Sequence, residues 1–530
     1  MKKHLFSVFV WSSLAIMAQT PPAIKWQKSY GGTSADNANS IKQTTDGGYI
    51  VAGASTSTNG DITLNKGTYD YWVTKIDSTG TLQWEKTLGG SGDDEANAVI
   101  QTMDGGYVVV GFSNSADSNI TNPKGQYDVW VVKLNGAGSV KWQKSLGGTA
   151  PDQAWDIQQT TDKGYIIAAG SASNNYDLTL NNGQSDFWVV KTDSLGAIQW
   201  QTSLGGSGVD IARSVQQTSD GGYIIAGQST STNGDVTGNY GNVDFWVTRL
   251  SSTGTLQWEK SLGGTAADVA NSIKQTTDGG YIVAGKTKSN DGIVTGNNGS
   301  ENVWLIKLSS TGTVSWEKCY GGTLDDYAMS VSQCSDGGYI FAGTATSNTL
   351  DVSGNNGGND YWTVKTYSTG AIEWQKCLGG TGSDHATSIQ ITSDNGYVVA
   401  GTSTSTNGDV TVAKGQNDYW VVKFVGTVVT QTTTSPPPTG IAEITANSSR
   451  VSVYPNPGDG LITVTMDAPL LAQLSSLQII TTMGQLVYET DLKQSEVRID
   501  FSGNLAKGIY FLQLKNSTGS LVATKKLLIN

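Results

Sequence analysis

Short apolar segments, separated by turns rich in Gly, Asp and Asn, recur along most of this chain. In the first copy of the pattern, residues 49–54 form an apolar, β-branched run, and residues 70–76 alternate between two faces. A shorter segment, residues 40–44, precedes the turn at Asp46, and residues 81–87 follow a second tight turn. Alternation with a period of two, bounded by such turns, is typical of strands. The pattern therefore predicts four strands in each copy and no helix in the repeated region.

Two series of tryptophans set the length of the repeat. Within each series the members lie 58 residues apart, and seven copies follow one another without an insertion or a deletion. The first series is Trp26, Trp84, Trp142, Trp200, Trp258, Trp316 and Trp374. The second series is Trp72, Trp130, Trp188, Trp246, Trp304, Trp362 and Trp420. Seven copies of a four-stranded unit with this long period are typical of a β-propeller.

The two ends of the repeated region fall in different phases of the four-strand pattern. The chain enters on a fourth strand, residues 24–30, and leaves on a third strand, residues 418–424. Pairing of these two strands would complete the last unit and remove both exposed edges. We therefore predict an all-β fold with a closed seven-bladed β-propeller over residues 19–425. The alternative is an open β-solenoid, which would leave one incomplete unit at each end.

Three further segments lie outside the repeat. Residues 1–18 combine a basic start, a short apolar run and a small final residue, which predicts a secretory signal peptide cleaved after Ala18. The Thr- and Pro-rich residues 426–444 predict an extended linker. Residues 445–530 contain seven short segments of strand type, which predict a small Ig-like β-sandwich. These segments are residues 451–454, 461–466, 477–482, 485–491, 497–501, 508–515 and 521–529.

The charge and the cysteines exclude several classes of protein. The formal net charge is −12 at pH 7, and an acidic chain without a basic run lacks the electrostatic footprint of a nucleic-acid-binding protein. Three cysteines are too few for a disulfide framework. Cys319 and Cys377 take a repeat position that is Ser or Thr elsewhere, so we expect packed, neutral thiols. A disulfide between Cys319 and Cys334 is the alternative.

Aspartates recur at fixed repeat positions. Asp36 and its six equivalents follow a Gly-Gly pair, in a loop before the first strand. A carboxylate in such a loop usually accepts hydrogen bonds from nearby backbone N–H groups, so we expect a structural role rather than a ring of cation ligands. Asp61 and Asp70 belong to an oxygen-rich loop of a kind that can hold Ca²⁺. Because the spacing differs from that of an EF-hand, calcium is only a hypothesis, and no other cofactor is predicted.

Residues that differ between copies at one repeat position are the candidates for a ligand site. We place them on the loop before the first strand, where an exposed aromatic ring can stack on a sugar or contact a peptide. Drift on a solvated loop is the alternative. These residues are Trp155, Arg213, Asp325, Tyr327, Met329 and His385.

The regularity of the repeat disfavours catalysis. An active site needs a few unlike residues that converge at one place, whereas almost every Asp here has six equivalents. His385 is a lone histidine without metal-ligand spacing, which is typical of a surface residue. We therefore predict that the chain is not an enzyme.

The carboxy-terminal 85 or so residues carry four motifs in a fixed order. They begin Val453-Tyr454-Pro455-Asn456-Pro457, Met483-Gly484-Gln485, Leu505-Ala506-Lys507-Gly508-Ile509-Tyr510 and Lys525-Lys526-Leu527. In these motifs the segment resembles the type A C-terminal sorting domain of proteins exported by the type IX secretion system of Bacteroidota. The 58-residue copies also resemble the Asp-Gly-Gly-Tyr propeller-like repeats found in such cargo.

The resemblance implies a route of export. A Sec signal peptide would take the chain across the inner membrane, and the outer-membrane translocon and its sortase would recognise the tail. The cargo is then either attached to surface lipopolysaccharide or released. The residues that carry this implied signal are Tyr454, Pro455, Asn456, Pro457, Gly484, Gly508, Tyr510, Lys525 and Lys526.

Three functions remain open from the sequence. The first is a monomeric, secreted or cell-surface binding protein that presents a propeller face to a glycan or a protein. The second is a propeller polysaccharide lyase or glycosidase, which would need a localised cluster of acid, base and Arg. The third is a structural surface protein without a specific ligand. Fold alone does not separate them.

Overall fold

The computed structural model describes residues 19–426, 450–455, 461–481, 486–500, 508–516 and 521–529. The predicted signal peptide and nearly all of the predicted linker lie outside these residues. The chain divides into two compact units, Met1–Thr430 and Gln431–Asn530. Among the described residues, helix is limited to the four-residue α2 (Ala468–Leu471), and no helix has the length and apolarity that a membrane crossing requires.

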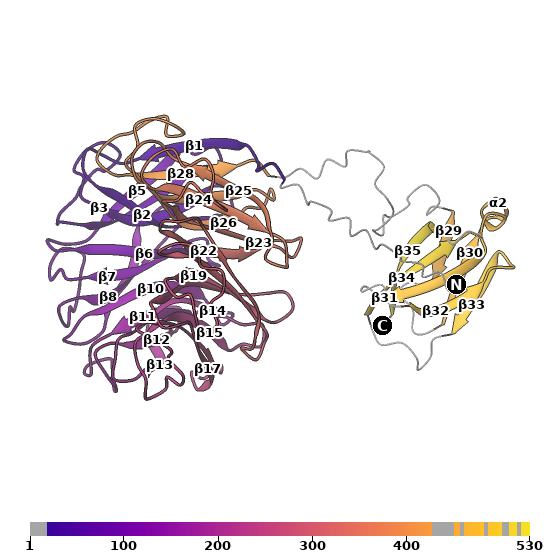
Figure 1. The fold of residues 1–530 in the computed structure, drawn as a ribbon, viewed down its shortest axis with the longest axis horizontal. Coiled ribbons are helices and arrows are strands. Elements are labelled where there is room, and N and C mark those ends of the chain that lie inside the picture. Colours follow the sequence, from indigo (N-terminus) through magenta and orange to yellow (C-terminus); the bar gives the residue numbers. More distant parts are fainter. Residues whose placement is uncertain are drawn as a thin grey trace, which may run out of the picture. The chain divides into compact units, whose positions relative to one another are not determined.

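The described part of the first unit consists of seven antiparallel sheets of four strands each (Figure 1). The first sheet contains β2 (Asp36–Gln43), β3 (Tyr49–Ser55), β4 (Asp70–Ile76) and β5 (Leu82–Leu88). The second and third contain β6 (Asp94–Gln101), β7 (Tyr107–Ser113), β8 (Asp128–Leu134), β9 (Val140–Leu146), β10 (Asp152–Gln159), β11 (Tyr165–Ser171), β12 (Asp186–Thr192) and β13 (Ile198–Leu204). The fourth and fifth contain β14 (Asp210–Gln217), β15 (Tyr223–Ser229), β16 (Asp244–Leu250), β17 (Leu256–Leu262), β18 (Asp268–Gln275), β19 (Tyr281–Thr287), β20 (Asn302–Leu308) and β21 (Val314–Tyr320). The sixth contains β22 (Asp326–Gln333), β23 (Tyr339–Ala345), β24 (Asp360–Thr366) and β25 (Ile372–Leu378).

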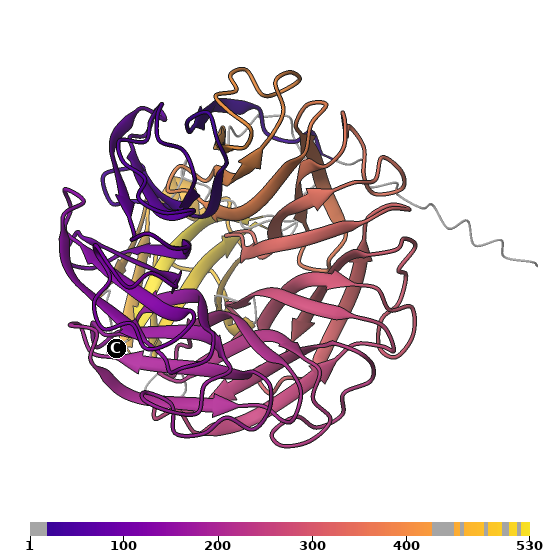
Figure 2. The same ribbon diagram turned by 90° about the vertical axis from the view of Figure 1, so that its left-hand side faces the viewer.

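The seventh sheet joins the two ends of the repeated region. It contains β26 (Asp384–Ile391), β27 (Tyr397–Ser403), β28 (Asp418–Phe424) and, as its fourth strand, β1 (Ile24–Tyr30). β1 is antiparallel to β28, with Lys28 opposite Val421. Figure 2 shows this last sheet (orange) next to the first (indigo). The predicted pairing of the first strand with the last is confirmed.

Neighbouring sheets are held together by aromatic side chains. The second series of tryptophans is almost fully buried, and each indole N–H donates to a Gln or Glu on the adjacent fourth strand, such as Trp130 to Gln143 Oε1 at 2.9 Å. The first series contacts a tyrosine of the next sheet, as Trp84 does Tyr107 at 5.7 Å between ring centroids. Burial of one large aromatic contributes about 4–6 kcal/mol before the cost of ordering the chain. These contacts explain why all seven copies keep both tryptophans.

The first strand of each copy, called the inner strand below, is longer than the sequence predicts. β2 begins at Asp36, whereas the expected strand began at residue 40. The pairing register shifts between Ala38 and Ser40, so residue 39 is an extra residue in a β-bulge, and the same shift recurs in the equivalent strands of the other six sheets. A bulge interrupts the alternation of faces, which hid the start of the strand. The candidate ligand residues Trp155, Arg213, Tyr327 and His385 therefore lie on strands, and their predicted loop position is wrong.

The recurring Asp36 position has the structural role expected of it. Asp36 is fully buried, accepts a hydrogen bond from the Gly32 N–H at 2.7 Å, and also accepts from the hydroxyls of Ser55 and Ser57. The six equivalent aspartates are equally buried, and each accepts from the corresponding Gly-Gly loop. These carboxylates fasten the loop that precedes each inner strand.

The three cysteines carry free thiols. Cys334 and Cys377 are buried, and burial raises the pKa of the Cys334 thiol to about 11 and that of Cys319 to about 12. The expectation of neutral, packed thiols is confirmed, and the alternative disulfide between Cys319 and Cys334 is wrong.

The second unit contains two sheets that share one core. One sheet is β29 (Val451–Tyr454), β30 (Leu461–Met466) and β33 (Glu496–Asp500), and the other is β32 (Leu486–Asp491), β31 (Ser476–Thr481), β34 (Gly508–Lys515) and β35 (Leu521–Ile529). Ile462 and Val464 of the first sheet pack in the same cluster as Leu512 and Leu514 of the second. All seven strands expected from the sequence are present, with ends that agree to within one residue.

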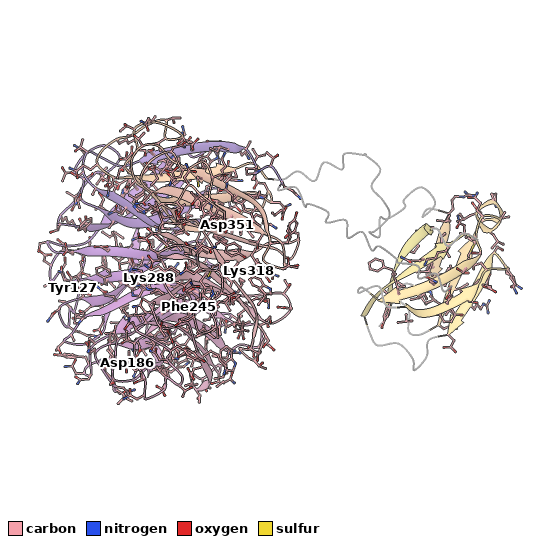
Figure 3. The ribbon with its side chains drawn as sticks, in the orientation of Figure 1. Tyr127, Asp186, Phe245, Lys288, Lys318 and Asp351 are labelled. Atoms are coloured by element: carbon pink, nitrogen blue, oxygen red, sulfur yellow. The ribbon has the colours of Figure 1, made fainter. Side chains whose placement is uncertain are left out.

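A second set of buried carboxylates begins the third strand of six sheets. One oxygen of each accepts a backbone hydrogen bond, as Asp186 does from Asn182 N–H at 2.7 Å, while the other has no hydrogen-bond partner among the described residues. Burial raises the pKa of Asp186, which Figure 3 labels, to about 6, and the nearby Asp210 carboxylate adds to the rise. The corresponding residues in four other sheets, Asp70, Asp128, Asp244 and Asp360, behave in the same way. The fifth sheet has the neutral Asn302 at this position.

These aspartates predict that the protein gains stability in mild acid. Their folded-state pKa of about 6 exceeds the unfolded value, so the folded state takes up protons preferentially as the pH falls from about 7.5 to about 5. Asp186→Asn, which copies Asn302, should raise the free energy of unfolding at about pH 7.5 by on the order of 1 kcal/mol and reduce the pH dependence. Thermal unfolding followed by circular dichroism at several pH values measures both effects. Asp193→Asn, in a hairpin turn where the second copy has Asn135, is the matched control. A wild-type free energy of unfolding that decreases as the pH is lowered from about 7.5 to about 5 would contradict the prediction.

Candidate functional site

One cavity, of about 280 Å³, is lined by side chains from all seven inner strands of the repeated unit. These strands are β2, β6, β10, β14, β18, β22 and β26. Figure 2 shows the sheets of the repeated unit arranged around a common centre. Because each sheet contributes only a few side chains, the chemistry of the cavity depends on how the copies differ from one another.

The bulge in each inner strand decides which residues face this cavity. The register shift places two consecutive residues on its wall, and in β10 these are Trp155 and Asp156. The equivalent pair in β14 is Arg213 and Ser214. The candidates Trp155, Arg213 and Met329 therefore lie on the cavity wall, as half-buried side chains rather than as exposed loop residues.

Trp155 and Arg213 form a pair within the cavity. The Arg213 guanidinium lies over the Trp155 ring at 4.7 Å from its centroid, which is a cation–π contact. Burial lowers the pKa of Arg213, and its Nε is a buried donor without a hydrogen-bond partner among the described residues. Among the described residues, the guanidinium makes one long hydrogen bond, from Nη2 to Gln228 Oε1 at 3.4 Å. This guanidinium therefore has hydrogen-bonding capacity that the described part of the chain does not use.

Other copies use the same position to hold adjacent sheets together. Asn39, Asn97 and Asn271 each donate a side-chain hydrogen bond to a backbone carbonyl of the next sheet, at 2.8–2.9 Å. Thr387 does the same toward Ala38 O, at 2.8 Å. Trp155 cannot make this amide hydrogen bond, and at this position the third copy contacts the next sheet through the Arg213 guanidinium instead. In the sequence, Trp155 was recognisable as a candidate because it differs from the residues at the same position in the other copies.

Asp156 is a carboxylate that the fold already uses. It stands where five other copies have Ser, and it accepts hydrogen bonds from the Val215 N–H at 3.0 Å and the Ser214 hydroxyl at 3.2 Å. The equivalent Ser40 accepts from the Val99 N–H in the same way. Asp156 therefore serves the contact between the third and fourth sheets.

Tyr327 and His385 form a second pair, away from the residues that line the cavity. The Tyr327 hydroxyl lies 3.0 Å from His385 Nδ1, and Asn359 Nδ2 lies 3.5 Å from Nε2. The Lys286 ammonium lies 5.6 Å from the Tyr327 ring centroid and forms an ion pair with Glu301. His385 is half-buried, so its expected place as a plain surface residue is wrong. Of the other candidates, Asp325 is exposed and accepts a hydrogen bond from Ser300.

The loop residues proposed for calcium have other partners. Asp61 forms an ion pair with Lys414 and accepts a hydrogen bond from the Gly31 N–H at 3.1 Å. Asp70 is fully buried and accepts from the Lys66 N–H at 2.7 Å. Within the described ranges, no three His, Cys, Asp or Glu side chains gather closely enough to hold a metal ion. The calcium hypothesis therefore rests on the composition of the loop alone.

The implied sorting motifs are spread over the second unit. Tyr454 is exposed at the end of β29, next to Pro455, whereas Tyr510 is buried in β34 opposite Leu527. Gly508 begins β34, and Lys525 and Lys526 lie in the last strand, β35. Asn456, Pro457 and Gly484 lie outside the described residues.

A family comparison identifies the tail. Residues 452–530 match the family described as the secretion system C-terminal sorting domain. The carboxy-terminal region is therefore a sorting domain of the type IX system, as its motifs indicated. This domain implies that the chain is exported to the cell surface or the medium and that it interacts with the type IX machinery.

Comparisons of the whole chain give weaker likenesses. The regulatory protein FlaEY of Caulobacter vibrioides is 24% identical over 458 residues, which cover 74% of this chain and 47% of FlaEY. The chain thus spans about half the length of this curated relative. PorZ of Porphyromonas gingivalis, a surface component of the type IX secretion system, has a TM-score of 0.30 at 12% identity, over 92% of this chain and 73% of PorZ. BBS1N, from its complex with ARL6DN, has a TM-score of 0.40 at 12% identity, over 77% and 97%.

The environment of His385 makes a measurable prediction. Burial lowers the pKa of its imidazole, against an opposing effect of the Asp384 charge, so we expect it to titrate below the ordinary value of about 6.5. A pH titration of the histidine side-chain resonances by NMR measures this pKa, and His385→Asn, which copies Asn37, assigns the signal. The same residue in urea-unfolded protein should titrate near the ordinary value. A folded-state pKa at or above that value would show that the imidazole is not buried as described.

Proposed function

We propose that this chain is a non-enzymatic binding protein of the cell surface or the medium, delivered by the type IX system. A closed seven-bladed β-propeller over residues 19–425 would bind the ligand, and an Ig-like sorting domain over residues 445–530 would direct export. The observation that carries the proposal is the cavity lined by all seven inner strands, with the Trp155–Arg213 pair in its wall.

Closure of the propeller is supported by contacts between the last and first sheets that repeat those between the others. Trp26 contacts Tyr49 at 5.8 Å between centroids, as Trp84 contacts Tyr107. The Tyr419 hydroxyl donates to Trp72 O at 2.8 Å, as that of Tyr361 does to Trp420 O. A closed ring requires the seventh interface to resemble the other six, and these bonds have that property.

A binding role is favoured over catalysis by how the acidic group of the cavity is used. Asp156 accepts hydrogen bonds from the Val215 N–H and the Ser214 hydroxyl, so its carboxylate is already engaged in the contact between the third and fourth sheets. A lyase or glycosidase remains the second candidate because Tyr327 and His385 are within hydrogen-bonding distance. Incubation with acidic and neutral polysaccharides tests it, and His385→Asn should abolish any cleavage that depends on this pair.

Glycan binding at Trp155 is the first test of the proposed function. We expect the full chain to bind a set of glycans on an array and to lose about tenfold or more in affinity on Trp155→Asn. Asparagine is the natural residue at this position in three copies, so the variant should fold, and it can restore the hydrogen bond to the next sheet. Tyr240→Asn removes an exposed aromatic outside the cavity and is the control. Repeating the array with a calcium chelator tests the calcium hypothesis.

The outcomes separate the functions. Loss of binding in Trp155→Asn alone supports the proposal. Absence of saturable binding by folded protein, with or without calcium, would favour a structural surface protein or a protein partner over a glycan.

Export depends on the tail. We expect deletion of residues 452–530 to keep the protein inside the bacterial cells that produce it, because the translocon would no longer recognise it. Immunoblots of cell and medium fractions measure the distribution. Export of the truncated chain at the wild-type level would show that another segment carries the signal. Surface attachment to lipopolysaccharide, as opposed to release, would appear in the same blots as a shift of the mature protein to higher mass.

A further inference from the structure

Two lysines lie on the wall of the central cavity, on inner strands that are far apart in the sequence. Lys42 belongs to β2 in the first copy and Lys274 to β18 in the fifth, and both line the cavity. They occupy the same repeat position, at which the third, fourth and seventh copies have Gln158, Gln216 and Gln390. The two charges lie close enough for Lys274 to lower the pKa of Lys42, after the larger effect of burial.

The glutamines at this position stabilise the contact between sheets. Gln216 Oε1 accepts a hydrogen bond from the Gln275 N–H at 2.7 Å, and Gln158 and Gln390 accept equivalent bonds. Lysine has three donors and no acceptor, so Lys42 and Lys274 cannot make this bond. The first and fifth copies therefore forgo a bond between sheets and place a cation in the cavity instead.

The two ammonium groups have no hydrogen bond or ion pair within the part of the chain that the structure describes. Elsewhere in the repeat, buried lysines are paired, as Lys75 is with Asp46 at 2.8 Å. Arg213 adds a third cation to the cavity, with an Nε that also lacks a partner. Asp156 is the carboxylate that offsets them, and its oxygens accept from the backbone and from Ser214. A cationic centre in a chain of net charge −12 indicates affinity for an anion.

We propose that Lys42, Lys274 and Arg213 form an oxyanion site at the centre of the repeated unit, which binds the sulfate, phosphate or carboxylate group of a ligand. This inference rests on the proposed function and adds that the ligand carries a negative charge. A guanidinium and two ammonium groups supply the strong, charge-assisted donors that oxyanions prefer. The cavity of about 280 Å³ accommodates one such group together with the ring that carries it. Trp155 then provides the face against which that ring stacks.

Titration calorimetry on the full chain tests the site directly. The probes are inorganic sulfate, inorganic phosphate, an oligosaccharide that ends in a uronic acid, and the matched neutral oligosaccharide. The double variant Lys42→Gln, Lys274→Gln takes the residues of three other copies and restores two hydrogen-bond acceptors, so it should fold at least as stably as the wild type. Lys141→Gln, at an exposed position of β9, makes a single charge change of the same kind outside the cavity.

We expect the acidic probes to bind with an affinity that falls as salt is added, and at least about tenfold more weakly to the double variant. Lys141→Gln should bind as the wild type does. Failure of all anionic probes to bind, or equal binding by the wild type and the double variant, would overturn the inference. Equal affinity for acidic and neutral oligosaccharides, both lost in Trp155→Asn, would also overturn it while leaving the proposed function standing. Binding of sulfate but of no oligosaccharide would support the oxyanion site and contradict a glycan ligand.

Discussion

Contact between neighbouring sheets is the interaction on which the repeated unit depends. Each sheet is apolar on both faces, and its two middle strands are almost wholly buried only because another sheet covers either side. A single four-stranded copy cannot bury two faces by itself. The tryptophans, the Tyr–Trp pairs and the side-chain bonds to the next backbone all serve this contact. The same need explains why β1 belongs to the sheet of β28 and not to that of its nearest neighbour in sequence.

The sequence predicted most of this architecture because the repeat has no gaps. Because the period is strict, strands assigned in one copy are predicted at the same positions in the other six, as for those that begin at Tyr49 and Asp70. The pairing of β1 with β28 followed from the different phases of the two ends. The start of the inner strand at Asp36 did not follow, since a bulge after Ala38 breaks the alternation that identifies a strand. In the tail, α2 was missed because four residues are too few to show a helical period.

The candidate site was only half predictable. Comparison of the copies singled out Trp155, Arg213, Tyr327 and His385, because each departs from its equivalents. Trp155 and Arg213 lie in the cavity, whereas Tyr327 and His385 pair outside it. This depends on the directions of the side chains, which the repeat pattern of the sequence does not indicate. Lys42 and Lys274 passed unnoticed because lysine at an alternating polar position looks like any solvated residue. Only the structure shows that both line one cavity and that Lys274 lies close enough to lower the pKa of Lys42.

The position of β1 has a consequence for the order in which the protein can mature. Gln27 and Trp420, which share a hydrogen bond, are 393 residues apart, so the last sheet stays incomplete until nearly all of the repeat has been synthesised. The sorting domain is synthesised after that final strand. A chain that carries the sorting domain therefore also contains every strand of the sheet to which β1 belongs. A chain that terminates before β28 lacks both the partner strand of β1 and the sorting domain, so the sorting domain marks chains whose repeated unit can complete its seventh sheet.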